Sequence, residues 1–276
     1  MAGRYTGRLL ALELVMIALA ALFLVPLYFV VVNSVKPFRE IMIDASAMPR
    51  EFTWENYTRA WAAIDYPTVF ANTLFITVCS LFGLVVLGSM AAWRLARRPG
   101  KLSNALLILF ISAMVIPFQA IMIPLVVFTS RLGLIDSRLG LVVMYFGFGV
   151  SFTLFLYHGF VKMIPIEVEE AAIVDGCRPM TLFWRIVFPL LKPMTVTVTI
   201  LNGLWIWNDF LLPLLVLHDR SIHTIQLGAY RFFAQYTKQW DLAMATLTMS
   251  ITPIIVFFLL MQRHIIEGIA QGAVKG

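Results

Sequence analysis

Polar residues that could bind another molecule gather in one stretch, 165–193, of an otherwise apolar sequence. Pro165 suits the first turn of a helix and Gly176 suits its end. Pro179 could begin a second short helix that Pro189 and Pro193 would end. We expect a link that folds into two helices to be held by another protein. Its charged side chains are Glu167, Glu169, Glu170, Asp175, Arg178, Arg185 and Lys192.

The sequence carries no pattern for catalysis by this chain alone. It has no GxxxxGK[ST] loop, so it cannot bind ATP in that way, and it has no GxSxG turn. No two of its four histidines stand four residues apart, and neither of its two cysteines has metal-ligand spacing. We therefore predict a protein that is not an enzyme and that holds no metal or cofactor of its own.

The composition indicates that the bilayer is the solvent of this chain. Of its 276 residues 61% are hydrophobic and 13% are charged, whereas soluble domains average about a quarter charged. The net charge of +6 fits basic cytoplasmic loops better than nucleic acid, because no basic run is interleaved with aromatic residues. We expect one all-α membrane domain over 1–276. Its six predicted spans are 9–32, 69–93, 103–128, 139–162, 194–217 and 242–262.

The orientation of these spans follows from Lys and Arg. The link 94–101 holds four basic residues and no acid, which is typical of a cytoplasmic loop. Arg4 and Arg8 put the N-terminus on the same side, and six spans return the C-terminus there. The polar loop 163–193 then also faces the cytoplasm. The predicted outer loops are not depleted of basic residues, so this orientation depends mainly on the link 94–101.

A second polar group, around Asp209, could line a pathway across the membrane. A carboxylate at membrane depth is costly and marks a functional site by default. Trp207 and Asn208 stand beside it, and aromatic faces next to amide and carboxylate groups suit sugars, whose hydroxyls need partners. Asn72 and Gln119 could line the same path. The alternative is a structural cluster of hydrogen-bonded polar side chains.

Two further features bear on partners. A self-contained ion-coupled carrier would show more acids within its spans or matching broken helices in its two halves, and neither is clear here. We therefore expect the energy to come from another chain, through the cytoplasmic loop. The outer segment FTWENYTRAW, at 52–61, is either an interfacial helix on the membrane surface or a contact for an extracytoplasmic partner.

The spacing within the polar stretch resembles the EAA motif of binding-protein-dependent ATP-binding-cassette importers. The family pattern is EAA, three residues, G, nine residues, I, one residue, LP. The segments NYTRAW and WNDFLLPL and the ending QRHIIEGIAQGAVKG resemble the sugar-importer branch, specifically its maltose-type second permease. Phe188 stands in place of the usual Leu and Cys177 in place of the usual Ala. The matching positions are Glu170, Ala171, Ala172, Asp175, Gly176, Ile186 and Pro189.

This resemblance implies a type I importer permease of six transmembrane helices with a cytoplasmic coupling helix at 165–175, about 16 Å long. In the family, nucleotide-binding subunits hold this helix, with Glu170 and Gly176 as its key positions. The family's C-terminal tail contacts the same subunits, which implies roles for Gly268, Gly272 and Lys275. The other implied partners are a second homologous permease, two ATPase subunits that carry ATP and Mg, an extracytoplasmic solute-binding protein and the lipid of a bacterial inner membrane.

The function implied is import of a sugar or oligosaccharide by alternating access, driven by ATP hydrolysis on partner subunits. In this branch the partner permease could hold most of the substrate contacts. Two alternatives stay open at this point: an importer of the same superfamily for a polyamine or glycerol phosphate, and a self-contained channel or secondary carrier in which the polar loop is a structural cap.

Overall fold

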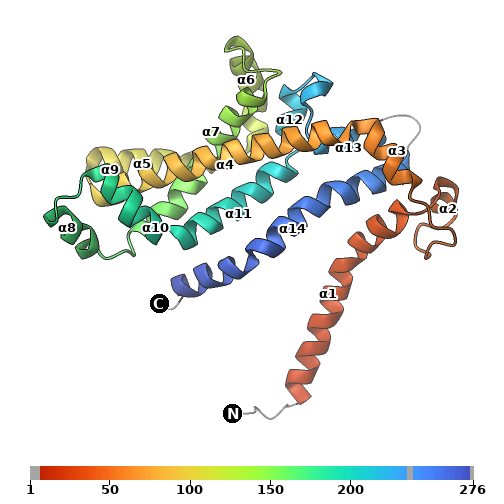
Figure 1. Cartoon of the computed structure of the whole chain (residues 1–276), viewed down its shortest axis with the longest axis horizontal. Helices are drawn as coiled ribbons and strands as arrows, with labels where there is room; N and C mark the ends of the chain where they lie inside the picture. Colours follow the sequence, from red (N-terminus) through yellow and green to blue (C-terminus); the bar gives the residue numbers. More distant parts are fainter. Residues whose placement is uncertain (1–6, 235–238, 274–276) are drawn as a thin grey trace. The chain divides into compact units, whose positions relative to one another are not determined.

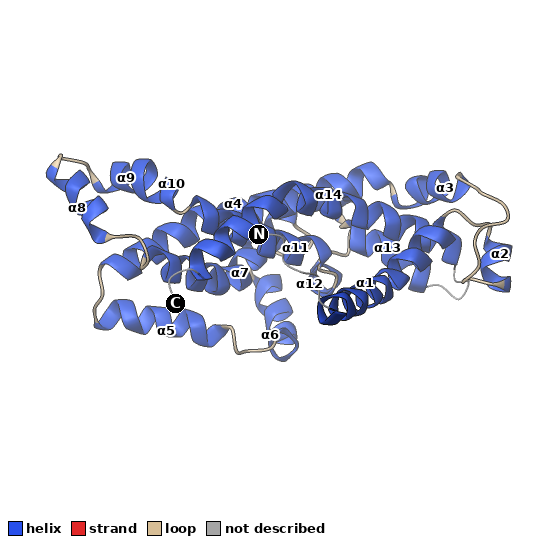
Figure 2. Cartoon of the chain, turned by 90° about the horizontal axis from the view of Figure 1, so that it is seen from below, coloured by secondary structure: helices blue, strands red, loops and turns tan. Residues whose placement is uncertain are grey.

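The structure is a computed structural model that describes residues 7–234 and 239–273. Every regular element in these ranges is helical, and they contain no strand (Figure 2). Residue contacts divide the chain into two compact units. Unit 1 comprises Met1–Tyr66 and Gly228–Thr252, and unit 2 comprises Pro67–Leu227 and Pro253–Gly276.

Unit 1 begins with a long apolar helix, α1 (Gly7–Ser34; Figure 1). Its side chains are exposed along most of its length. An apolar helix with no protein around it is suited to lipid. The segment that follows holds two short helices, α2 (Phe38–Ile43) and α3 (Glu55–Ile64). The unit is completed by parts of α13 (Ile225–Ala234) and α14 (Trp240–Ala273).

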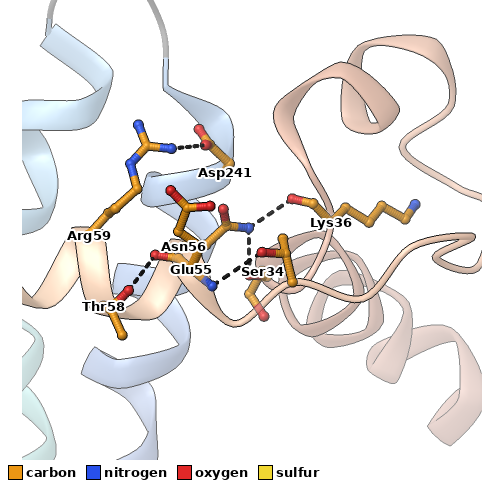
Figure 3. A network of polar contacts seen from close by, with 8 residues as sticks. Ser34, Lys36, Glu55, Asn56, Thr58, Arg59 and Asp241 are labelled. Atoms are coloured by element: carbon orange, nitrogen blue, oxygen red, sulfur yellow. Dashed lines mark hydrogen bonds and ion pairs between the residues drawn. The ribbon is translucent and has the colours of Figure 1, made fainter.

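A polar network fixes the segment after α1 within unit 1 (Figure 3). The buried Asn56 donates from Nδ2 to the carbonyl oxygens of Ser34, at 3.0 Å, and Lys36, at 2.8 Å. These carbonyls lie at the end of α1, where the helix itself offers no donors, so Asn56 satisfies them. Arg59 forms an ion pair with Asp241 on α14, at 3.7 Å. Trp54, at the start of α3, remains exposed, with its ring centroid 5.7 Å from that of Tyr57.

Unit 2 contains the polar stretch that the sequence singles out. Two buried clusters hold its helices together, one near the polar stretch and one around the start of α7 and the end of α11. The helix α7 packs against both α5 and α11. The elements are α4 (Tyr66–Arg97), α5 (Lys101–Ala113), α6 (Phe118–Arg131), α7 (Arg138–Val161), α8 (Ile166–Val174), α9 (Pro179–Leu182), the π-helix η1 (Phe183–Val187), α10 (Phe188–Leu190), α11 (Lys192–Asn208), α12 (Leu211–Val216) and the 3₁₀ helix η2 (Arg220–Ile222).

Small residues let α4 approach its neighbours closely, as expected for membrane helices. A Cβ on Gly88 would lie 2.6 Å from Cγ2 of Thr153 on α7. A Cβ on Gly149 of α7 would lie 2.8 Å from Cδ1 of Leu84. Both glycines therefore stand where any side chain would collide, and the contact of α4 with α7 depends on them.

The predicted spans are confirmed as helices in four places. Four helices are long and apolar enough to cross a membrane, and the number rises to six if each of two bent helix pairs counts as one span. The all-helical fold is therefore as predicted. The four helical stretches that meet the length and composition criteria are Leu9–Ser34, Tyr66–Arg97, Arg138–Val161 and Trp240–Gln262.

Each of the predicted spans 103–128 and 194–217 contains a break between two helices. In the first, α5 and α6 meet at an angle of 103°, because Pro117 lacks an N–H and takes an extended conformation before α6. In the second, α11 ends at Asn208 and Asp209 is extended. The apolar runs identify these helices correctly, but hydropathy carries no information on where a helix bends.

Candidate functional site

The polar stretch folds into α8, as its helix punctuation predicts. Pro165 precedes the first turn, and Gly176 has a φ of +83°, in the left-handed region that favours glycine. The N–H of Gly176 donates to the carbonyl of Ile173, at 2.9 Å, and that of Cys177 to Ala172, at 3.0 Å. This pair of bonds is a Schellman motif, which satisfies carbonyls that the end of the helix leaves without donors. The chain therefore turns sharply at Gly176.

A buried carboxylate attaches α8 to the end of α4. Oε1 of Glu169 accepts a hydrogen bond from Nε of Arg97, at 2.7 Å, and its Oε2 accepts from Nε1 of Trp93, at 2.9 Å. Arg97 also donates from Nη2 to the carbonyl of Ile164, at 2.8 Å. Since the side chains of Arg97 and Glu169 are only 15% and 6% exposed, water screens this pair weakly. Arg97 thus holds both Ile164, just before α8, and Glu169, within α8.

Apart from the side that carries Glu169 and Ala172, the surface of α8 is exposed. Glu170 is accessible to solvent, and so is Ala171. Ala172, in contrast, is buried in the cluster that includes Tyr157 and Phe183, so only one of the two alanines in the motif can meet a partner. The exposed surface also carries apolar side chains that a soluble loop would hide: Ile166, Val168, Ile173 and Val174.

The second helical segment differs from the predicted one. Pro189 does not end the helical segment, because α9 continues through the π-helix η1 into α10. Pro189 lies in the first turn of α10, where a residue without an N–H is tolerated. The helix ends at Leu191, where the chain bends by 74° into α11, and Pro193 lies in the first turn of α11. Ile186 and Cys177 pack at the edge of the buried cluster.

Asp209 does form the polar cluster that was the alternative to a pathway. Its Oδ2 accepts from the hydroxyl of Tyr145, at 2.9 Å, and its Oδ1 accepts from the N–H of Leu211, at 3.1 Å. The second bond stabilises the first turn of α12. Trp207 is buried with its ring edge against Phe70, and the adjacent Asn208 is exposed. Only part of the WNDF segment is therefore exposed.

Asn72 and Gln119 lie in separate environments. The buried Asn72 donates from Nδ2 to the carbonyl oxygens of Ser221, at 2.9 Å, and His223, at 3.1 Å. Its Oδ1 accepts from Arg138, at 3.3 Å. Asn72 thus attaches the loop around η2 to α4. Gln119 is exposed on α6.

The remaining predicted positions lie at the end of the chain. Gly268 and Gly272 fall within the last turns of α14, and Lys275 lies outside the described residues. Within the part of the chain that the structure describes, no three His, Cys, Asp or Glu side chains gather as they would around a metal ion.

Sequence reasoning missed the roles of Glu169, Arg97 and Trp93. Glu169 counted only as one member of an acidic cluster, and Arg97 only as an indicator of orientation. The signal that was available is helix spacing: Glu169 stands three residues before Ala172, so both lie on the face of α8 that packs inward. Its partners on α4 are more than 70 residues away in sequence, and spacing cannot reveal them.

Comparisons with known proteins identify the family of this chain. Residues 83–271 match the family described as binding-protein-dependent transport system inner membrane component. The probable starch degradation products transport system permease protein AmyC of Thermoanaerobacterium thermosulfurigenes is 42% identical over 259 residues, which are 94% of each chain. The multiple sugar-binding transport system permease protein MsmG of Streptococcus mutans is 39% identical over 258 residues, 92% of each chain.

A solved structure shows the same fold at lower identity. A chain of a bacterial ABC transporter involved in the import of the acidic polysaccharide alginate superimposes with a TM-score of 0.81. The match covers 94% of this chain and 98% of that one, at 20% identity. Together with the family match over most of the sequence, these similarities show that the chain belongs to the family of inner membrane components of binding-protein-dependent transport systems.

Proposed function

We propose that this chain is a membrane-spanning subunit of an ATP-driven importer for a sugar or oligosaccharide. The relatives support the substrate class, because their names refer to starch degradation products, to multiple sugars and to melibiose, raffinose and stachyose. The chain is 42%, 39% and 32% identical to these three proteins over at least nine tenths of its length. The whole sequence, 1–276, acts in this proposal as one permease domain.

The observation that carries the proposal is the attachment of an exposed helix to a membrane-spanning one. One face of α8 is fixed to α4 through Glu169 and Arg97, while Glu170 and Ile173 remain exposed. A partner that moves α8 therefore also moves the end of α4. In the proposal α8 is the coupling helix, and Glu170 meets a basic group on an ATPase subunit.

The energy source belongs to other chains in this proposal. Two ATPase subunits bind ATP and Mg, and their closure moves the coupling helices of this chain and of a second, homologous permease. The tail positions Gly268, Gly272 and Lys275 make further contacts with the ATPase subunits. ATP can shift the equilibrium toward the outward-open state only if the closed ATPase dimer binds that state more tightly.

The solute enters from an extracytoplasmic solute-binding protein and leaves on the side of α8. Both termini are cytoplasmic in this orientation, which the basic link 94–101 supports. Trp207, Asn208, Asp209, Gln119 and Asn72 are the candidates on this chain for lining the path. Asp209→Asn separates a pathway role from a structural one, since the amide retains an acceptor for Leu211 and loses the charge. A changed uptake rate or substrate preference supports the first role, and wild-type uptake supports the second.

A charge reversal on α8 tests the coupling role. Glu170→Lys is expected to abolish sugar uptake and the stimulation of ATP hydrolysis by sugar-loaded binding protein, while membrane insertion of the chain stays unchanged. The matched control is Glu51→Lys, which reverses an exposed carboxylate between α2 and α3 and should keep both activities. Full uptake by Glu170→Lys in reconstituted vesicles would contradict the coupling role.

A further inference from the structure

A groove of about 640 Å³ separates the end of α4 from the segment α8–α9. One wall comes from the end of α4 and the other from α8, α9 and the link between them. The residues that line it are Trp93, Arg94, Arg97, Arg98, Ile166, Glu169, Glu170, Ile173, Cys177, Pro179 and Leu182.

Two of the three arginines in this groove have no acidic partner among the described residues. Arg97 is committed to Glu169 and to the carbonyl of Ile164. Arg94 and Arg98 are exposed, and no ion pair is formed by either within residues 7–234 and 239–262. Arg94 lies in the last turn of α4, and Arg98 directly follows the last residue of that helix, with its N–H donating to the carbonyl of Arg94 at 3.2 Å. Both side chains line the groove. Two cations thus face one groove, and the only further carboxylate that lines it is that of Glu170.

The rest of the groove is apolar, which limits the ligands that fit it. Ile166, Ile173 and Leu182 contribute aliphatic walls beside the arginines. A free inorganic anion would use the charges and leave these walls unused. A phospholipid has a phosphate for the arginines and an acyl chain for the apolar side chains. The first residues of α5 agree with lipid nearby, because Leu102 is 73% exposed directly after Lys101.

We propose that this groove binds the headgroup of an anionic phospholipid, whose phosphate is held jointly by Arg94 and Arg98. Guanidinium groups bind phosphate through paired hydrogen bonds, and basic pockets on the cytoplasmic side of membrane proteins attract anionic headgroups. The assignment to the cytoplasmic leaflet rests on the orientation in the proposed function. The charges and apolar side chains of the groove do not depend on that orientation. A lipid in this place contacts α4 and α8 together and strengthens the attachment between them.

The test uses the assembled transporter, purified in mild detergent and transferred to nanodiscs of phosphatidylcholine with or without phosphatidylglycerol. Native mass spectrometry counts bound phosphatidylglycerol for the wild type and for Arg94→Gln/Arg98→Gln. The expected result is retained phosphatidylglycerol in the wild type and binding weaker by about tenfold or more in the double variant. The control, Arg185→Gln/Lys192→Gln, removes the same charge from exposed positions outside the groove and should bind as the wild type does.

Three outcomes would overturn the proposal. The first is equal lipid binding by the wild type and the groove variant. The second is competition by inorganic phosphate alone, which would make the groove a site for the free anion. The third is loss of the ATPase subunits from the groove variant with unchanged lipid binding, which would assign the arginines to acidic groups of that partner. The coupling role is tested separately, by uptake and ATPase stimulation in Glu170→Lys. Glu170 also lines the groove, so the lipid measurement keeps this residue unchanged.

Discussion

Arg97, on the last turn of α4, donates from Nε to the carboxylate of Glu169 on α8 across 2.7 Å. A membrane-spanning helix and the exposed coupling segment are thereby joined by a buried, charge-assisted hydrogen bond, with Trp93 completing the carboxylate's partners. In the proposed transporter, movement of α8 is transmitted through this contact. Coupling in the proposed transporter is therefore expected to need the residue before the EAA motif as well as the motif itself.

Glu169→Gln tests the attachment of α8. The change leaves Arg97 mostly buried without its counter-charge, and removing one member of a buried ion pair typically costs about 3–5 kcal/mol. We expect hydrogen exchange to become faster in residues 164–182 and ATP-driven uptake to fall, with the rest of the chain unaffected. Glu167→Gln, at an exposed position of the same helix, is the control and should exchange like the wild type. Unchanged exchange in Glu169→Gln would show that the contact does not hold α8.

Gly176→Ala tests the turn after α8. No atom lies within 4 Å of the added Cβ, so the cost is only that of placing an L-residue at a φ of +83°, roughly 1–2 kcal/mol. The Schellman hydrogen bonds should open more often, as seen by faster exchange of the amides of Gly176 and Cys177. Gly159→Ala adds the same methyl group inside α7, also with nothing within 4 Å, and should leave stability equal or slightly higher.

Gly88→Ala tests the contact between α4 and α7. The new Cβ would lie 2.6 Å from Cγ2 of Thr153, a stiff β-branched side chain whose hydroxyl also accepts from Asn202. We expect a loss of about 1–3 kcal/mol, measured as a lower midpoint of thermal unfolding in detergent. Gly147→Ala, on α7 with open space around its Cβ, is the control. An unchanged midpoint for Gly88→Ala would mean that the two helices do not approach this closely.

Asp136 makes one loop contact sensitive to pH. Its carboxylate accepts from the backbone N–H of His218 and of Asp219, and these bonds hold its pKa below the ordinary value of 3.8. A depressed folded-state pKa stabilises the loop above the ordinary pKa, and this stability is lost as the pH falls through the lower, folded value. Protection of the two amides should therefore persist from neutral pH down to 3.8 and decrease below it.

Asp136→Asn separates titration from geometry at the same position. Asparagine tolerates the left-handed φ of 52° found here and keeps an acceptor, but it does not titrate. Protection of the amides of His218 and Asp219 should then be weaker and independent of pH, apart from the intrinsic exchange rate. A pH dependence that survives in this variant would assign the effect to another group.

Helix type, the stop at Gly176 and the family were predictable because they depend on local signals. Apolar runs reveal helices in a membrane chain, and a glycine after an acidic helix indicates its end. The EAA spacing identified the family, which the match over residues 83–271 confirms. The helix breaks at Pro117 and Asp209 were not predicted, because an apolar run has the same hydropathy whether the helix bends or not.

The partners of individual polar residues could not be predicted from the sequence, for a different reason. Asn72, a candidate for lining the pathway, donates to the carbonyls of Ser221 and His223, about 150 positions further along the chain. Glu169 and Arg97 are likewise distant in sequence and adjacent in space. Such pairs depend on which helix faces pack together, and no periodicity within one helix determines that.

The most direct test of the account is sugar uptake into vesicles that contain the permease pair with and without its ATPase subunits. Vesicles of both kinds carry ATP on the side of α8 and receive labelled sugar loaded on the solute-binding protein from the other side. Uptake is expected only when the ATPase subunits are present, and it should be lost with Glu170→Lys. Sugar uptake at the same rate without the ATPase subunits would contradict the central claim, because this chain would then need no partner to drive transport.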